Sequence, residues 1–226
     1  MKTLAHITFT GVDSLTDIQE LQEIQKQFPL VEFGVLIAGG FSNRCPDPGF
    51  IRELAHSGLN LSLHACGKYT AELIQTGSWD AIREASDNFA GFSRCQLNVS
   101  GRKPKEKTKT IVCPKELKEI IIQQRPGDTR IFNSIENKQN VSILMDASGG
   151  RGIDTEIVPF AYRKVGYAGG IYHGNVRDKL STLFSLDEVS TFWIDMESGV
   201  RTDEWFDTEK VRRVLNICDS FIGKEK

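Results

Sequence analysis

The sequence of 226 residues lacks any run of about 18 apolar residues, so no membrane-spanning helix is expected. Residues 1–11 also lack the long apolar stretch of a secretory signal peptide. The five cysteines are odd in number, widely spaced and without a CxxC pair, which argues against a disulfide framework. These absences are typical of a cytoplasmic protein with reduced thiols and no membrane partner.

The chain has almost no net charge. Its 28 basic and 30 acidic residues leave a formal charge of −2. This value offers no electrostatic reason to expect nucleic acid as a partner, so any anion site must be built locally. One basic run, at residues 101–118, has no apolar stripe before Ile111. Such a run is typical of a solvated surface, with contact to an anionic ligand as the alternative.

Strand-like and helix-like segments alternate from end to end. Eight strands are predicted, at residues 4–9, 31–38, 59–64, 92–99, 119–124, 141–146, 165–169 and 191–195. Helical patterns are predicted near residues 15–24, 48–57, 71–76, 80–88, 129–136, 155–164, 175–186 and 208–222. The right-handed connection rule then favours a closed α/β barrel or an open doubly wound sheet, and eight units favour the (β/α)8 barrel. No linker divides the chain, so residues 1–226 are predicted to form a single domain.

Capping residues mark the starts of the first two helices. Ser14 and Asp17 offer a capping-box-like start to the first helix, whose apolar face would include Leu15. Asp47 followed by Pro48 predicts the start of the second.

Glycine-bearing segments follow the last three predicted strands, at residues 146–152, 168–171 and 195–200. Glycine lets the backbone approach a ligand closely, and free N–H groups can bind an anion. Three such segments at the ends of successive strands predict a phosphate site at one rim of the barrel. Tight turns between strands and helices are the alternative explanation.

These segments resemble motifs of phosphoribosylanthranilate isomerase, a TIM barrel of tryptophan biosynthesis. The family's Leu-Leu-Asp and Gly-Gly-Thr-Gly are similar to residues 144–152, its Ala-Gly-Gly-Leu and Asn-Val to residues 168–176, and its Asp-x-x-Ser-Gly-Val-Glu to residues 195–201. Shorter matches are Ser-x-Arg at residues 42–44 and Gln-Leu-His-Gly at residues 96–98. The resemblance runs from about residue 7 to about residue 215 and is strongest in the last third.

The resemblance implies an Amadori rearrangement, an aldose-to-ketose isomerisation of a phosphorylated sugar derivative without a cofactor. Asp146 corresponds to the family's general acid, and its alternative role is to cap its own loop. Arg44 matches the arginine that holds the anthranilate carboxylate, or else is a surface arginine. Gln96 and Asn98 are further candidates for substrate binding. The residues implied in phosphate binding are Gly150, Arg151, Gly152, Gly169, Gly170, Ser198 and Gly199.

The family's general base, a cysteine, is replaced by Thr10. A threonine hydroxyl cannot remove a carbon-bound proton unaided, because it offers no anion near neutral pH. His64 and Cys66 lie two apart near the end of the third strand and join Thr10 as candidate catalytic residues. Filling of the barrel core is the alternative for both. Two ligands are too few for zinc, so no metal is predicted.

Two functions from different classes follow. The first is an isomerase of a phosphorylated sugar derivative. The second is a barrel that has lost the family reaction and binds a phosphorylated metabolite, or performs another reaction on one. Both predict a phosphorylated small molecule as partner, and both are compatible with a monomer or a homodimer. The fold alone does not choose between them.

Overall fold

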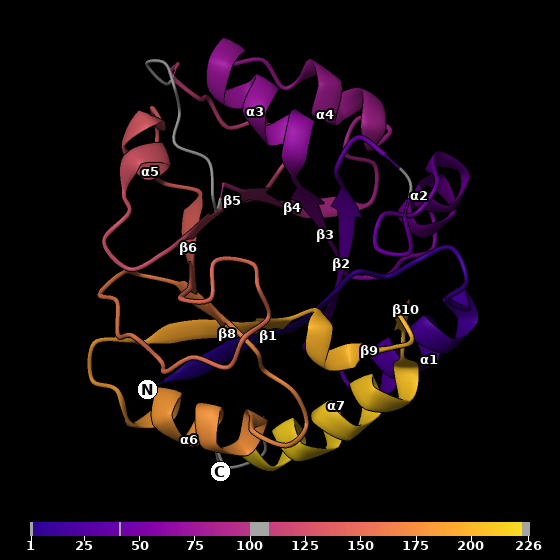
Figure 1. Cartoon of the computed structure of the whole chain (residues 1–226), viewed down its shortest axis with the longest axis vertical. Helices are drawn as coiled ribbons and strands as arrows, with labels where there is room; N and C mark the ends of the chain where they lie inside the picture. The colour runs from indigo at the N-terminus through magenta and orange to yellow at the C-terminus, as the bar shows by residue number, and fades with distance from the viewer. Residues whose placement is uncertain (1, 41, 100–108, 223–226) are drawn as a thin grey trace.

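The computed structural model describes residues 2–40, 42–99 and 109–222. Eight parallel strands form a closed barrel in the order of the sequence, which confirms the predicted TIM barrel (Figure 1). The strands are β1 (Thr3–Thr10), β2 (Val31–Ile37), β3 (Leu61–Ala65), β4 (Phe92–Asn98), β5 (Glu119–Gln124), β6 (Val141–Asp146), β7 (Val165–Ala168) and β8 (Thr191–Met196). That the chain forms a single domain stays a prediction.

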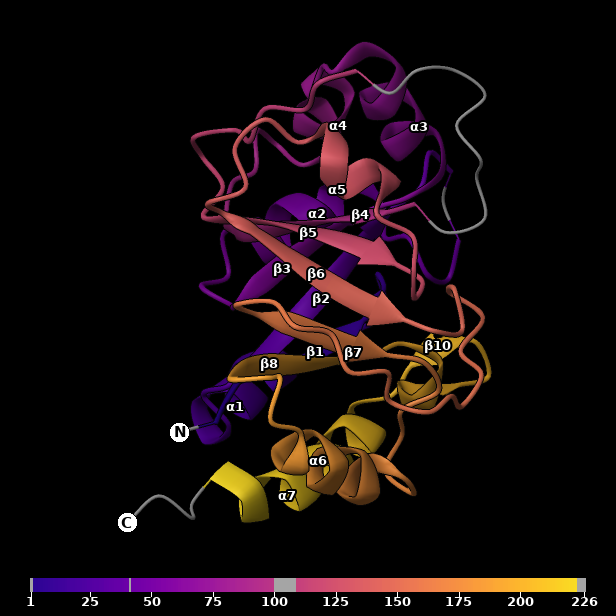
Figure 2. The same ribbon diagram turned by 90° about the vertical axis from the view of Figure 1, so that its left-hand side faces the viewer.

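The barrel closes where the first strand pairs with the last. β1 lies parallel to β8, with Thr8 opposite Asp195 and Phe9 opposite Met196. Because all strands run in one direction, their carboxyl ends reach the same rim, as the arrowheads in Figure 2 show. Residues from the two ends of the chain therefore become neighbours at this rim.

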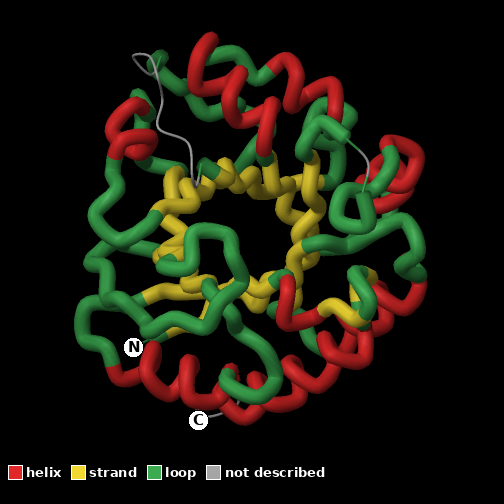
Figure 3. Tube along the Cα trace, in the orientation of Figure 1, coloured by secondary structure: helices red, strands yellow, loops and turns green. Residues whose placement is uncertain are grey.

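Helices surround the barrel, as Figure 3 shows. They are α1 (Ile18–Gln27), α2 (Pro48–Ala55), α3 (Gly67–Thr76), α4 (Asp80–Ala85), α5 (Arg130–Ser134), α6 (Val176–Ser185) and α7 (Thr208–Ile222). A short 3-10 turn, η1 (Ser198–Val200), and a hairpin of β9 (Arg201–Thr202) and β10 (Trp205–Phe206) connect β8 to α7. None of the described helices is both long and apolar enough to cross a membrane.

The first helix begins later than predicted. Asp17 caps it, and Leu15 lies outside it with 71% of its surface exposed, so the prediction for Leu15 is wrong. The reason is a local turn in which Asp13 Oδ1 accepts the Leu15 N–H at 3.1 Å and competes with the helix. Asp47 caps α2 as predicted, and Ser14 donates to Asp47 at 2.8 Å instead of capping α1.

Within the described stretch 109–222, no helix lies between β6 and β7, so the helix predicted at residues 155–164 is wrong. Pro159 lacks a backbone N–H and disfavours the helical conformation at the residue before it. Ile157, Phe160 and Tyr162 still pack against the core, so an irregular segment covers this side of the barrel. Residues 101–108 of the basic run after β4 lie outside the described residues, and Lys109 within them is exposed.

The barrel interior has a thin apolar layer, formed by Ile121, Leu144 and Trp193. Nearer the amino ends of the strands, Arg94 is buried against two carboxylates. Its Nη1 lies 2.7 Å from Glu32 Oε1, and its Nε lies 2.5 Å from Glu119 Oε2. Nearer the carboxyl ends, the inward side chains are again polar and form the floor of a cavity. The barrel is therefore closed by charge pairing at one end and open to ligand at the other.

Candidate active site

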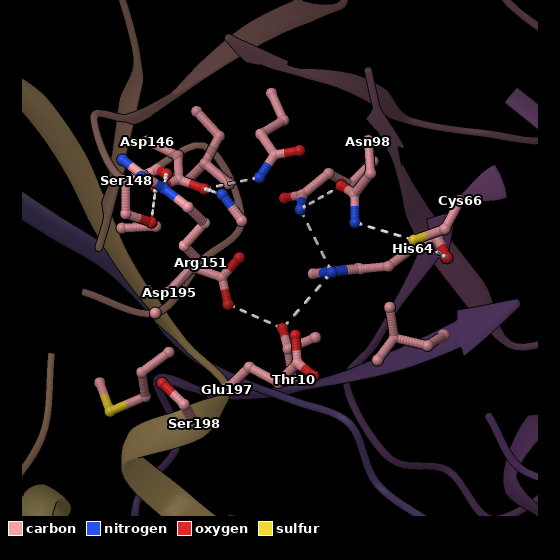
Figure 4. A pocket seen from close by; sticks show the side chains of 18 of the residues that line it. Thr10, His64, Cys66, Asn98, Asp146, Ser148, Arg151, Asp195, Glu197 and Ser198 are labelled. Carbon is pink, nitrogen blue, oxygen red and sulfur yellow. Dashed lines mark hydrogen bonds between the residues drawn. The ribbon is translucent and has the colours of Figure 1, made fainter. Parts of the chain in front are cut away.

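The carboxyl ends of the strands surround a cavity of about 450 Å³ (Figure 4). Active sites of TIM barrels lie at this end, where loops from several strands converge. The cavity collects nearly all of the site residues predicted from sequence: Thr10, Arg44, His64, Cys66, Gln96, Asn98, Asp146, Gly150, Arg151, Gly152, Gly169, Gly170 and Ser198. Gly199 lies in an adjoining hollow that shares Gly152, Gly170 and Ser198 with the cavity.

Asp146 is buried at the end of β6, and four donors hold its carboxylate. Ser148 Oγ donates to Oδ1 at 2.6 Å, and Gln123 Nε2 donates to Oδ2 at 2.7 Å. The backbone N–H groups of Gly149 and Gly150 add bonds of 3.1 and 2.5 Å. Their φ angles of +65° and +82° are readily adopted by glycine and fold the loop back onto the carboxylate. The Gly150 N–H therefore donates its hydrogen bond to Asp146 in this structure.

Asp195, at the same rim, is a second buried carboxyl group and is 6% exposed. It accepts a hydrogen bond from Thr10 Oγ1 at 2.7 Å, although the two residues are 185 positions apart. Burial raises the pKa of Asp195 to about 7; the Thr10 bond opposes this shift, and repulsion by Glu197, Glu32 and Asp146 adds to it. Sequence alone assigned no role to Asp195. Its position at a strand end ahead of a glycine loop was the available signal.

His64 lies between Thr10 and Gln96 and is buried. Its Nδ1 is 3.2 Å from Gln96 Nε2 and 3.4 Å from Thr10 Oγ1. Because Gln96 Nε2 can only donate, we assign the His64 proton to Nε2. Burial lowers the pKa of His64 to about 4, with Arg94 acting in the same direction and Glu32 against it. His64 is therefore a neutral imidazole near pH 7.

Cys66 receives a hydrogen bond from Asn98 Nδ2 at 2.9 Å. Burial raises the pKa of this thiol to about 12, and the Asn98 bond only partly offsets the effect. Gln96 Nε2 also donates to Asn98 Oδ1 at 2.8 Å, so hydrogen bonds link His64 through Gln96 and Asn98 to Cys66 (Figure 4). Across the described ranges, no three His, Cys, Asp or Glu side chains gather closely enough to hold a metal ion.

The three glycine loops pack against one another at the rim. A Cβ added at Gly170 would clash with the backbone nitrogen of Asp154, in the loop after β6. A Cβ at Gly199 would clash with a carbonyl oxygen of the loop after β7, and one at Gly152 with Ser198 Oγ. The loops therefore make tight turns, as the alternative drawn from sequence expects, and they also converge at the rim, while phosphate binding there stays a prediction.

The adjoining hollow, of about 370 Å³, brings four further polar side chains beside these glycines. They are Lys210, near the start of α7, Asp154, in the loop after β6, and Tyr172 and His173, in the loop after β7. The sequence reading missed Lys210, since its distance from the glycine loops along the chain offers no signal. Lys210, whose ammonium also donates to the Arg201 carbonyl, favours an anion in the hollow, whereas the Asp154 carboxylate opposes one.

Arg44 lines the cavity beside Glu197 and is already paired with acidic side chains. Its Nη1 lies 3.3 Å from Glu197 Oε1, and its Nη2 lies 3.8 Å from Glu204 Oε2. Burial raises the pKa of Glu197, while Arg44 and Arg201 lower it. Arg201 stands where the family motif has glutamate, and its guanidinium donates to the Gly11 carbonyl at 2.7 Å. Both arginines therefore serve contacts within the protein.

Solved structures of phosphoribosylanthranilate isomerases share this fold. Monomers generated from the dimeric enzyme of Thermotoga maritima align with a TM-score of 0.59 at 15% identity, covering 96% of this chain and 99% of that one. TrpF from Jonesia denitrificans aligns with a TM-score of 0.58 at 15% identity, covering 99% and 100%. The isomerase of Thermus thermophilus aligns with a TM-score of 0.56 at 16% identity, covering 96% of this chain and 99% of that one.

The comparisons show which class of fold the chain has, and they do not identify its reaction. No family model matches the sequence, and no curated protein matches it significantly. The structural alignments show that the chain has the TIM-barrel fold of these isomerases, and at identities of 15–16% they show the fold alone. The sequence resemblance is thus confirmed at the level of the fold, and the reaction has to be argued from the site.

Proposed function

We propose that this chain is an acid/base isomerase that converts a phosphorylated sugar derivative from its aldose to its ketose form. The observation that carries the proposal is the pair of buried carboxyl groups, Asp146 and Asp195, at one cavity in different environments. Four donors surround Asp146, whereas the Asp195 carboxyl group accepts one hydrogen bond, from Thr10, among the described residues. Carboxyl groups in unlike environments suit a division of labour between acid and base.

In this proposal Asp146 is the general acid. It protonates the ring oxygen of the sugar, which opens the furanose to a Schiff base. A protonated Asp146 remains compatible with its surroundings, because the Ser148 hydroxyl can turn to accept the proton that Oδ1 then carries. The closed barrel floor and the loop at residues 146–152 shield Asp146 and the sugar ring oxygen from water, which favours proton transfer between them.

Asp195 is the general base and acts with Thr10. Thr10 takes the proton from C2 while its own hydroxyl proton passes to Asp195 across the 2.7 Å hydrogen bond. The electron pair of the broken C–H bond forms the enol, which tautomerises to the ketose. A pKa of about 7 suits this role, because Asp195 is ionised in part of the molecules near neutral pH and holds a proton well enough to accept one. The carboxylate thus supplies the anion that threonine lacks.

His64 and Cys66 are less suited to be the base. With a pKa of about 4 His64 is a weak proton acceptor, and with a pKa of about 12 Cys66 stays a thiol near neutral pH. We propose that His64 positions Thr10, and that Gln96 and Asn98 hold the ring and the thiol in place.

We expect the phosphate to bind where the glycine loops converge. The backbone N–H groups of Gly152 and Gly170 donate to no acceptor among the described residues, and both glycines line the cavity and the adjoining hollow. Lys210 supplies positive charge nearby. The remaining residues proposed for this site are Gly150, Arg151, Gly169, Ser198 and Gly199.

Turnover by purified protein tests the proposal. Ribose 5-phosphate mixed with anthranilate, aniline or anthranilamide forms candidate phosphoribosylamines in solution, and ketose formation is followed. We expect at least one mixture to react, and Asp195→Asn or Asp146→Asn to lower the rate by about 10² to 10⁴-fold. Undiminished turnover in Asp146→Asn or Asp195→Asn would remove that residue from the mechanism.

The alternative function is binding without turnover, and the replacement of the family's cysteine by Thr10 favours it. Binding of ribose 5-phosphate with no turnover of any mixture supports this alternative. The variant Thr10→Cys separates the two further. Activity that appears only in this variant means that the native chain has another function.

A further inference from the structure

The wall of the cavity around Glu197 carries one cation, Arg44, among the described residues. Two acids face it: Glu197 Oε1 lies 3.3 Å away and Glu204 Oε2 lies 3.8 Å away. The resemblance implied that this arginine holds a substrate carboxylate. In the structure its charge is instead matched by carboxylates of the protein itself.

We infer that the amine-derived part of the substrate carries hydrogen-bond donors and no carboxylate, and that Glu197 receives it. The inference rests on the proposed function and specifies its substrate class: a phosphate at one end and an amide-like or amine-like group at the other.

The first argument concerns Arg44. Its charge is already shared by Glu197 and Glu204, so a substrate carboxylate at its guanidinium would be a third anion beside one cation. Glu197 is the less exposed of the two acids, with 32% of its side-chain surface exposed, so water screens its charge less than that of Glu204. Repulsion by these two carboxylates therefore disfavours a substrate carboxylate at this wall.

The second argument concerns Glu197 itself. Its Oε1 atom is buried and has no aligned hydrogen bond within the described residues, although the 3.3 Å contact to Arg44 matches its charge. Buried oxygen atoms in proteins almost always accept a hydrogen bond. Since Glu197 lines the cavity, an N–H of the substrate can supply the missing donor while the pair with Arg44 stays intact.

The third argument is that this wall offers a carboxylate no second cation. The remaining side chains near Glu197 and Arg44 are Leu36, Ser42, Cys45, Cys66, Asn98 and Met196, all without charge near neutral pH, and Arg151 belongs to the loop after β6. The amide of Asn98 already donates to Cys66 and accepts from Gln96. Arg201 is engaged with the carbonyl oxygens of Gly11, at 2.7 Å, and Asn43, at 2.5 Å.

Three stable analogues test the inference by calorimetric titration of the full chain. They are 1-amino-1-deoxyribitol 5-phosphates whose nitrogen carries a phenyl, a 2-carbamoylphenyl or a 2-carboxyphenyl group. We expect the carbamoyl compound to bind most tightly and the carboxylate at least about tenfold more weakly, which equals about 1.4 kcal/mol.

Glu197→Gln removes the competing charge, so the carboxylate analogue should gain at least about tenfold in affinity, and Glu197→Ala serves as a second variant. Glu204→Gln is the matched control, since Glu204 is 70% exposed and lies farther from Arg44. This variant should bind the three analogues in the same order of affinity as the wild type.

Tightest binding of the carboxylate analogue by the wild type, lost in Arg44→Ala, would overturn the inference and leave the isomerase proposal intact. Equal affinity for all three would overturn it as well. Failure of all three and of ribitol 5-phosphate to bind would count against the proposed function together with the inference.

Discussion

Replacing Asp195 with asparagine should stabilise the protein while it lowers activity. Burial raises the pKa of Asp195 from its ordinary value of 3.8 to about 7, a difference of about three pKa units. At ~1.4 kcal/mol per unit, folding opposes ionisation of this group by a free energy on the order of 4 kcal/mol. In the proposed mechanism the base is thus a carboxyl group that the fold disfavours in its charged form.

The direction of the pH dependence follows from the two pKa values. Between pH 3.8 and about 7 the folded protein holds a proton on Asp195 that the unfolded chain has lost. The wild type therefore loses stability as the pH rises through this window, and the loss is complete above it. Asparagine stays neutral throughout and can still accept the Thr10 hydroxyl bond.

Thermal unfolding followed by circular dichroism at pH 8 and pH 5 measures the effect. At pH 8 Asp195→Asn should unfold about 8–16 °C above the wild type, from ~2–4 °C per kcal/mol for a chain of this size. Most of this advantage should disappear at pH 5. An Asp195→Asn variant less stable than the wild type at pH 8, or an advantage equal at both pH values, refutes the reasoning.

Asp146→Asn is the matched control for this experiment. An asparagine side chain has one acceptor oxygen, and it cannot receive the four donors that now surround Asp146. This variant should lose stability at both pH values, so the two aspartates are distinguished by the sign of the change.

Four further predictions use different parts of the structure. The kcat/KM of the wild type should rise with pH through about 7, as Asp195 ionises, and a flat profile would exclude it as the base. Thr10→Val should lower kcat/KM by about 10²-fold or more while Thr10→Ser retains it, and equal loss in both would show that the hydroxyl is not needed. Arg94→Met leaves the buried Glu32 without its cationic partner and Glu119 with Lys164 alone, so it should lower the free energy of unfolding by about 3–5 kcal/mol in urea titration, whereas an unchanged midpoint contradicts the buried pairing. Gly170→Ala should destabilise the chain more than Gly127→Ala, because both have positive φ but only Gly170 packs against another loop, and equal losses would leave backbone strain as the sole cause.

The sequence predicted the architecture because the barrel is built from local patterns. Apolar runs such as those of β2 and β6 alternate with amphipathic segments, and glycine marks the loops after β6, β7 and β8. The error at residues 155–164 arose because apolar spacing there resembles a helix, while Pro159 and contacts with the core favour an irregular segment. Local pattern therefore determined which segments are strands and which rim carries the site.

Tertiary structure alone decided the chemistry of that rim. Closure of β1 on β8 brings Thr10 to Asp195, and no feature of either segment predicts the pairing. The same folding places Glu197 beside Arg44. It also buries three titratable side chains, which lowers the pKa of His64 and raises the pKa values of Cys66 and Asp195. The physical reason is that a side chain's proton affinity depends on its burial and on the charges around it, and both depend on residues distant along the chain.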